Sequence, residues 1–199
     1  EGGLNVPPGV SLIGAGWQNT ILNGNGAGVV VYASPGSTIR GMTIRGSSAG
    51  DFDAGIWTSS GATAILENRI TGNSAGVWAW CFDPGACTIR VTLERNIIDA
   101  NSSNGVNSNE RAIFTLRNNT VAGNGAAGVI LNDAGSTAEN NIIAGNAGDG
   151  LVNNAGASGR TPVDSDDDAR WHSILAANLT GTFYATRAAL RKMGKGGRI

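Results

Sequence analysis

Residues 95–101 read RNIIDAN, and close variants of this phrase recur along the chain. ENRITGN at 67–73 and the more distant GMTIRGS at 41–47 precede it, and NNTVAGN at 118–124 and NNIIAGN at 140–146 follow it. Aligned on the last residue, the phrases advance in steps of 22 to 28 residues. A period of this length indicates a solenoid of stacked coils, in which neighbouring coils bury each other's inward side chains.

Three columns of the repeat predict how each coil is built. The aliphatic column is expected to form one buried ladder, with Ile21 as an earlier member: Ile44, Ile70, Ile98, Val121 and Ile143. Two polar columns are expected at corners: Met42, Asn68, Asn96, Asn119 and Asn141, and then Ser47, Asn73, Asn101, Asn124 and Asn146. There an amide can bond the equivalent amide of the next coil, while its own backbone adopts the left-handed conformation that asparagine tolerates.

A second apolar strand follows each phrase and begins with glycine, as in GIWTS at 55–59 and GVWAW at 76–80. Period-two alternation without helical spacing favours coils made of strands alone. The inward positions of this strand are expected to be Val29, Ile56, Val77, Val106 and Val129. Their outward neighbours would then be Val30, Trp57, Trp78, Asn107 and Ile130.

Four aromatic residues are therefore expected on one outer face of the solenoid: Tyr32, Trp57, Trp78 and Trp80. Sugar rings stack on such flat aromatic surfaces, so these residues are candidates for carbohydrate stacking. The alternative is that a loop folds over the rings and buries them, and the loop between Cys81 and Cys87 is a candidate cover. The two cysteines themselves could form a disulfide or remain two small buried side chains.

Residues 10–150 resemble the right-handed parallel β-helix repeats of pectate-lyase-like proteins. The resemblance implies a mainly-β, single-stranded parallel β-helix of about six coils, a polysaccharide as partner and an extracellular or periplasmic location. It leaves the activity open, because β-helices occur in lyases, hydrolases, epimerases and adhesins. No catalytic site is predicted here. Asp51 and Asp53, in GDFDAG, are only weak candidates for metal binding or catalysis, and we expect them to be solvated loop residues.

The repeat stops after Gly150, and a helical period follows a short loop. The apolar positions from Trp171 have the spacing of one long amphipathic helix: Ile174, Leu175, Leu179, Phe183 and Leu190. The acidic run at 164–168 favours its start, and the glycines from Gly194 favour its end. We therefore expect two segments, 1–150 and 151–199, with the junction at 149–156.

Residues 151–199 resemble one segment of the short-chain dehydrogenase/reductase family, through LVNNAG at 151–156, NLTGTFYATRAALRKM at 178–193 and GGRI at 196–199. The resemblance implies that Asn178 matches the asparagine of the family's catalytic tetrad. It also implies a cofactor-binding place for Asn153, Asn154, Ala155 and Gly156. However, GLVNNAGAS at 150–158 also aligns with GVILNDAGS at 128–136, in the preceding coil.

The family's glycine-rich dinucleotide turn would precede this segment, where the coils are expected, and its serine, tyrosine and lysine would follow Ile199. We therefore expect an inactive dehydrogenase fragment in a chimeric or truncated chain, with Asn178 without function and no cofactor. The alternative is an NAD(P)-dependent oxidoreductase in the cytoplasm, whose other parts are missing from this chain. A third reading is structural, with the helix shielding the open edge of the last coil.

Bulk composition excludes two classes of partner. The net charge is -1 and only 15% of the 199 residues are charged, so neither nucleic acid nor an anionic membrane surface is favoured. Self-association through the apolar helix face or the solenoid edge is an expected route to oligomers.

Overall fold

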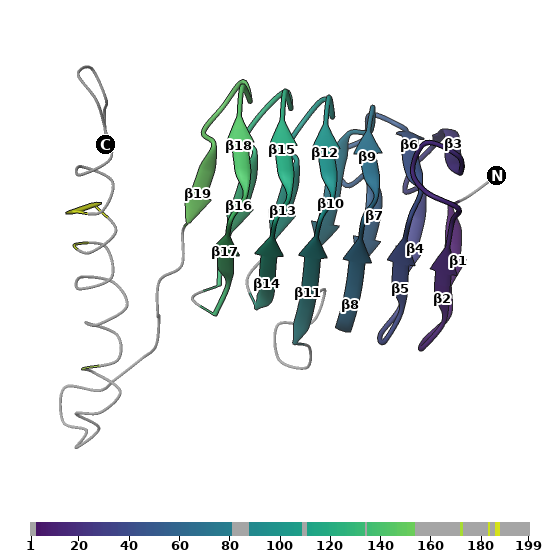
Figure 1. Ribbon diagram of the computed structural model, residues 1–199, viewed down its shortest axis with the longest axis horizontal. Helices are drawn as coiled ribbons and strands as arrows, with labels where there is room; N and C mark the ends of the chain where they lie inside the picture. The colour runs from purple at the N-terminus through teal and green to yellow at the C-terminus, as the bar shows by residue number, and fades with distance from the viewer. Residues whose placement is uncertain are drawn as a thin grey trace. The chain divides into compact units, whose positions relative to one another are not determined.

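The structure is a computed structural model of the chain, and it describes residues 3–80, 88–108, 111–133 and 135–153, with four single residues beyond them. The chain divides into two compact units, Glu1–Asn154 and Ala155–Ile199. Within the first unit the described residues form 19 β-strands and three parallel sheets (Figure 1). No helix in the described residues is long and apolar enough to cross a membrane.

The three sheets, named A, B and C here, run along the length of the solenoid. Sheet A contains seven strands: β1 (Leu4–Val6), β4 (Val31–Ala33), β7 (Ala54–Thr58), β10 (Ala75–Ala79), β13 (Val106–Ser108), β16 (Val129–Leu131) and β19 (Leu151–Asn153). Sheet B contains six: β2 (Ser11–Ile13), β5 (Thr38–Arg40), β8 (Gly61–Leu66), β11 (Ile89–Glu94), β14 (Ala112–Arg117) and β17 (Thr137–Glu139). Sheet C also contains six: β3 (Ile21–Ala27), β6 (Thr43–Ser47), β9 (Arg69–Thr71), β12 (Ile97–Asp99), β15 (Thr120–Ala122) and β18 (Ile142–Ala144).

Each strand pairs with the third strand before and after it in the chain, so one strand from each sheet makes a coil. β1 to β18 thus form six coils, and β19 begins a seventh (Figure 1). All strand pairs are parallel, as stacking of successive coils in one direction requires. The prediction of a mainly-β parallel solenoid of about six coils is confirmed.

The aliphatic ladder lies on the inner face of sheet C. In register its members are Leu22, Ile44, Ile70, Ile98, Val121 and Ile143. The four from Ile44 to Val121 are fully buried, and Ile143, in the last coil, is partly buried. The prediction of Ile21 in this ladder was wrong, because Leu22 pairs with Ile44 and Ile21 is 55% exposed. In a strand a shift of one residue moves the side chain to the opposite face.

The register of sheet A also differs at its second strand. Val31 pairs with Ile56 and Tyr32 pairs with Trp57, so the predicted columns were displaced by two residues at Val29 and Val30. The faces predicted for these two residues were also wrong: Val30 is 2% exposed and packs in the core, and Val29 lines a groove on the outer side. Both residues precede β4, where strand alternation does not yet apply. The strands from β7 to β16 have the predicted register, with Ile56, Val77, Val106 and Val129 in one inward column.

The two asparagine columns form hydrogen-bonded ladders at the corners. At the corner between sheets B and C, the Asn96 backbone N–H donates to Asn119 Oδ1 over 2.9 Å. The side-chain Nδ2 of Asn96 donates to the same oxygen over 3.0 Å and to the Ile65 carbonyl over 2.8 Å. Asn101 repeats this pattern toward Asn124 at the corner between sheets C and A. Both amides are buried and fully bonded, so the corners hold polar groups inside the solenoid without an unpaired donor.

The left-handed backbone lies one residue before each ladder asparagine, which corrects the prediction. At the first corner these residues have φ between 54° and 56°: Glu67, Arg95, Asn118 and Asn140. At the second corner Gly72 and Ala100 take the same place. The ladder asparagine points inward to bond its neighbours, so the residue before it makes the turn and directs its own side chain outward. The corner therefore accepts charged residues such as Glu67 and Arg95.

The predicted long helix lies almost wholly outside the described residues and stays a prediction. In the second unit the structure describes only His172, Phe183, Thr186 and Arg187, each with helical backbone. The guanidinium of Arg187 lies 5.3 Å from the centre of the Phe183 ring. Cys81 and Cys87 also lie outside the described residues.

Candidate functional site

The outer face of sheet A places aromatic side chains on successive coils. Asn5, Tyr32, Trp57, Trp78, Asn107 and Ile130 follow one another in register across β1, β4, β7, β10, β13 and β16. Trp80 follows β10 on the same face, two residues after Trp78. The four aromatic residues predicted for one outer face thus occupy three neighbouring coils.

The tryptophans pack on one another. The rings of Trp57 and Trp78 are stacked, with centroids 5.9 Å apart and an angle of 22° between their planes. Trp78 and Trp80 lie 6.3 Å apart with tilted planes. Stacked and tilted pairs are the arrangements that aromatic quadrupoles favour, so this group is a stable feature of the surface.

Phe52 covers the tryptophans from a loop that precedes β7. Its ring lies 5.6 Å from Trp78, 5.6 Å from Trp80 and 6.5 Å from Trp57. Trp57 is only 7% exposed, Trp78 and Trp80 are partly buried, and Phe52 itself is 54% exposed. The reachable aromatic surface is therefore formed by Phe52 and by Tyr32, which is 40% exposed, with the tryptophans as their base.

Asp53 anchors the loop that presents Phe52. Its Oδ2 accepts hydrogen bonds from the Gly50 N–H, over 2.8 Å, and from the Ser48 hydroxyl. The Asp53 N–H donates back to the Gly50 carbonyl over 3.1 Å. Asp51 in the same loop is exposed. Within the described ranges, no group of three or more His, Cys, Asp or Glu residues could hold a metal ion.

A groove of about 490 Å³ opens beside Tyr32. Aromatic rings and small polar groups line it together: Asn5, Tyr32, Ser34, Phe52, Asp53, Trp57, Ser59 and Ser60. Flat rings and a few neutral hydrogen-bonding groups in one concavity are the usual composition of a site for a polar organic ligand. Sequence reasoning missed the groove and Phe52, although an aromatic residue within the polar insertion GDFDAG was a signal for them.

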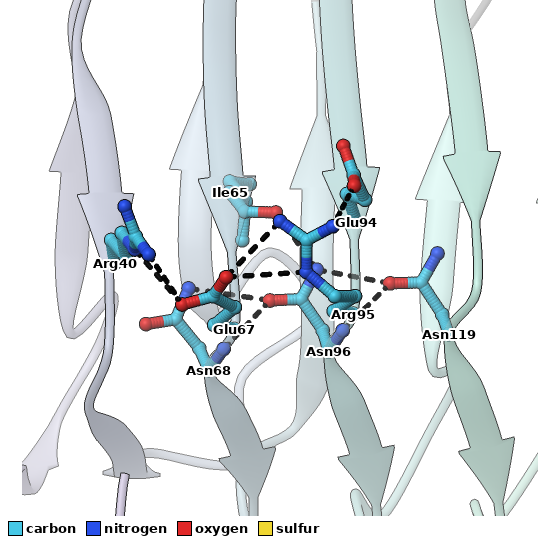
Figure 2. A network of polar contacts seen from close by, with 8 residues as sticks. All are labelled: Arg40, Ile65, Glu67, Asn68, Glu94, Arg95, Asn96 and Asn119. Carbon is cyan, nitrogen blue, oxygen red and sulfur yellow. Dashed lines mark hydrogen bonds and ion pairs between the residues drawn. The ribbon is translucent and has the colours of Figure 1, made fainter. Parts of the chain in front are cut away.

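The corner between sheets B and C is charged instead. Glu67 lies between two arginines: its Oε2 accepts from Arg40 Nε over 2.9 Å, and its Oε1 accepts from Arg95 Nε over 3.2 Å (Figure 2). Arg95 also pairs with Glu94. The hydrogen bond from Arg40 is the largest of the interactions that hold the pKa of Glu67 below its ordinary value of 4.5. These charges are paired with one another along the corner, directly outside the asparagine ladder.

A separate ion pair lies on the outer face of sheet C. Arg69 donates to both carboxylate oxygens of Asp99, over 3.2 Å and 2.8 Å, and the bond to Asp99 raises the pKa of Arg69 above its ordinary value. The Arg69 guanidinium also lies 5.9 Å from the centre of the Trp17 ring. The two hydrogen bonds fix the position of the Arg69 side chain, so the ion pair links two neighbouring coils at the surface.

The dehydrogenase-like stretch begins inside the solenoid. Leu151 pairs with Val129 and Asn153 pairs with Leu131, so the backbone of LVN at 151–153 continues sheet A as β19. The other residues assigned by the resemblance lie outside the described part of the chain: Asn154, Ala155, Gly156 and Asn178. Their roles, and the stacking role of the four aromatic residues, stay predictions.

Two family models match the sequence. One, described as a right-handed β-helix region, matches residues 57–160, just over half of the 199 residues. The other, described as short chain dehydrogenase, matches residues 132–199. The two matches overlap at 132–160, which includes strands β17 to β19 of the solenoid.

The curated relatives match a short segment only. A short-chain dehydrogenase/reductase of Pyricularia oryzae is 51% identical over 41 residues, which are 21% of this chain and 15% of the relative. The 2-(S)-hydroxypropyl-CoM dehydrogenase 3 of Xanthobacter autotrophicus is 51% identical over 41 residues, 21% of this chain and 16% of that protein. The chain thus spans about one sixth of the length of these relatives. No solved structure is significantly similar to it.

Proposed function

Since this chain belongs to the right-handed β-helix family, we propose that its solenoid is a carbohydrate-binding module and that the outer face of sheet A is its binding surface. The observation that supports the proposal most is the groove in which Tyr32, Phe52 and Trp57 meet neutral polar side chains. Aromatic faces contact the C–H groups of a sugar ring, and hydroxyls and amides bond its hydroxyl groups.

The geometry of the coils suits a polymer better than a single sugar. Successive strands of a sheet lie about 4.8 Å apart, which is close to the length of one sugar unit in an extended chain. A polysaccharide along the solenoid axis would meet Asn5 and Tyr32 on successive coils, and then Phe52 above Trp57 of the next coil. Repetition of the coil would then match repetition of the ligand.

Binding without cleavage is the form of the proposal that the groove supports. Most glycoside hydrolases place two carboxyl groups roughly 5 to 10 Å apart across the bond that breaks. Asp53 is the one carboxylate among the described residues of the groove, and its Oδ2 is already bonded to the loop. A single carboxylate engaged in this way favours adhesion over hydrolysis.

The binding test uses the exposed rings, because their removal leaves the interior intact. Tyr32→Ala and Phe52→Ala should each weaken binding of soluble polysaccharides by about tenfold, measured by tryptophan fluorescence titration. Thr92→Ala, at an exposed outward position of β11, is the matched control and should bind as the unchanged protein does. Equal binding by all three variants would contradict the proposed surface.

The short chain dehydrogenase match at 132–199 raises hydride transfer as a second candidate function. We propose that this segment transfers no hydride in this chain, because residues 137–153 of the matched range include three strands of the solenoid. A nicotinamide cofactor binds where a strand leads through a glycine-rich turn into a helix, so that the pyrophosphate meets the helix N-terminus. Strands β17 to β19 are instead paired with the preceding coil.

Addition of NADH or NADPH with assorted ketones tests this second proposal. The expected result is no saturable change in melting temperature and no loss of cofactor absorbance. Turnover that disappears in Asn178→Ala would restore the oxidoreductase. The origin of the joined segments, as a natural fusion or a joining of two fragments, is tested by reading the genomic DNA through both ends on one molecule.

A further inference from the structure

Charge is distributed unequally over the three sheets. The seven strands of sheet A contain no charged residue. The strands of sheets B and C contain all the charged strand residues in the described part of the chain: Arg40, Arg45, Arg69, Arg90, Glu94, Asp99, Arg117 and Glu139. The aromatic surface therefore lies on the one sheet whose strands are uncharged.

The lining of the groove is also uncharged, except for one acidic residue. Its hydrogen-bonding groups are the amide of Asn5 and the hydroxyls of Tyr32, Ser34, Ser59 and Ser60. Asp53 is the one charged residue among its described lining residues, and it is negative. A polymer with a carboxylate on each unit would approach Asp53 against like-charge repulsion.

The arginines of the described strands lie on the other sheets, and several of them already hold carboxylates there. Arg40 and Arg95 bond Glu67, and Arg69 holds Asp99 with two hydrogen bonds. A polyuronate on sheet A would lose the hydration of its carboxylates without gaining a cationic partner from these residues. A neutral chain loses only hydroxyl hydration, which the amide and hydroxyls of the groove replace.

From these observations we infer that the sheet A groove selects an uncharged polysaccharide and discriminates against polyuronates. The inference rests on the proposed carbohydrate-binding function and adds the class of ligand to it. Selection arises from the neutral polar lining together with the negative charge of Asp53. Discrimination against the anionic chain should weaken as salt screens that charge.

The test compares polymers that share a backbone and differ in charge. Hydroxyethylcellulose is paired with carboxymethylcellulose, and methyl-esterified polygalacturonate is paired with its de-esterified form. Affinity electrophoresis measures retardation of the intact chain in gels that contain each polymer. At low salt we expect the neutral member of at least one pair to retard the protein about tenfold more strongly than its anionic partner, with a smaller ratio at high salt.

A charge change within the groove makes the test specific. Asn5 is exposed at the groove, and Ser11 is exposed on sheet B. Asn5→Lys should increase retardation by the anionic polymers severalfold, because it supplies the missing cation. Ser11→Lys, with the same change in net charge, should leave it as in the unchanged protein. An equal increase in retardation for both variants would show that net charge alone determines binding of the anionic polymers, and would overturn the inference.

The remaining outcomes separate the inference from the proposed function. Anionic polymers that bind as tightly as their neutral partners, with loss of binding in Tyr32→Ala, would overturn the selectivity and leave the carbohydrate-binding function in place. Absence of retardation in every neutral and anionic gel would overturn both.

Discussion

The outer face of sheet A and the corner between sheets B and C belong to the same coils but differ in surface chemistry: one is aromatic and uncharged, and the other is charged. On sheet A, Tyr32, Trp57 and Trp78 follow one another as aromatic residues. At the corner, Arg40, Glu67 and Arg95 follow one another as alternating charges (Figure 2). Inward positions accept only side chains that pack on the equivalent residues of the neighbouring coils. Outward positions can vary in residue type from one sheet to another. The comparison teaches that binding properties of this solenoid are to be sought in its outward residues, sheet by sheet.

The largest effect is expected from the interior that both surfaces share. Ile98→Asn places an amide between Ile70 and Val121, where the side chain is fully buried and no ladder partner exists. We expect a loss of about 3–5 kcal/mol of unfolding free energy, measured by denaturant unfolding with circular dichroism. Cooperative melting at an unchanged temperature would show that the register of sheet C is wrong.

The next largest effect is expected at the ladder beneath the charged corner. Asn96→Ala removes the acceptor of the Asn68 N–H and the donor to the Ile65 carbonyl, and leaves both groups buried. The expected loss is about 2–4 kcal/mol, because each unsatisfied buried group costs roughly 1–3 kcal/mol. Asn107→Ala, at an outward position of sheet A, is the matched control and should change stability by less than about 0.5 kcal/mol. Similar losses in both variants would remove the distinction between inward and outward asparagines.

Removal of the ring that covers the tryptophans should have a moderate effect. Phe52→Ala deletes three aromatic contacts and should reduce stability by about 1 kcal/mol. The tryptophan emission should shift to longer wavelength, because Trp78 and Trp80 lose their cover. An unchanged emission maximum would mean that Phe52 does not shield these rings in solution.

The smallest effect is expected from the charged corner itself. Glu67 has a lowered pKa in the folded chain, so its stabilisation is present above the ordinary value of 4.5 and is lost as the pH falls through the lowered pKa. Glu67→Gln should change the melting temperature at neutral pH within the usual range of surface substitutions, because exposed ion pairs contribute little. An NMR titration of the Glu67 carboxyl should have its midpoint below 4.5. A midpoint at or above that value would mean that Arg40 and Arg95 do not hold this carboxylate.

The sequence predicted the interior of the solenoid better than its surface, for a physical reason. Inward residues repeat because they stack on their own kind, so Ile70, Ile98 and the ladder asparagines could be aligned without a structure. Errors arose where neighbouring residues are similar, as with Ile21 beside Leu22, since only strand pairing decides which of them enters the core. The left-handed residue was misplaced by one position, because asparagine tolerates that conformation and the residue before each ladder asparagine can be a glycine, an alanine, a charged residue or a second asparagine.

The candidate site was only partly predictable. Tyr32, Trp57, Trp78 and Trp80 could be placed on one face from alternation, because their outward direction depends only on parity. Phe52 could not, since it comes from an irregular loop that Asp53 organises through local hydrogen bonds. The ion pairs Arg40–Glu67 and Arg69–Asp99 join residues one coil apart, and they could be identified only once the register was known.

The most direct test of the account follows the indole N–H signals of the tryptophans by NMR while cellohexaose, mannohexaose and xylohexaose are added in turn. Trp17 is an internal reference, because it lies against Arg69 of sheet C and not on the aromatic face. We expect at least one neutral hexasaccharide to shift the signals of Trp57, Trp78 and Trp80 and to leave that of Trp17 in place. Shifts confined to Trp17, or no shift with any of the three ligands, would contradict it.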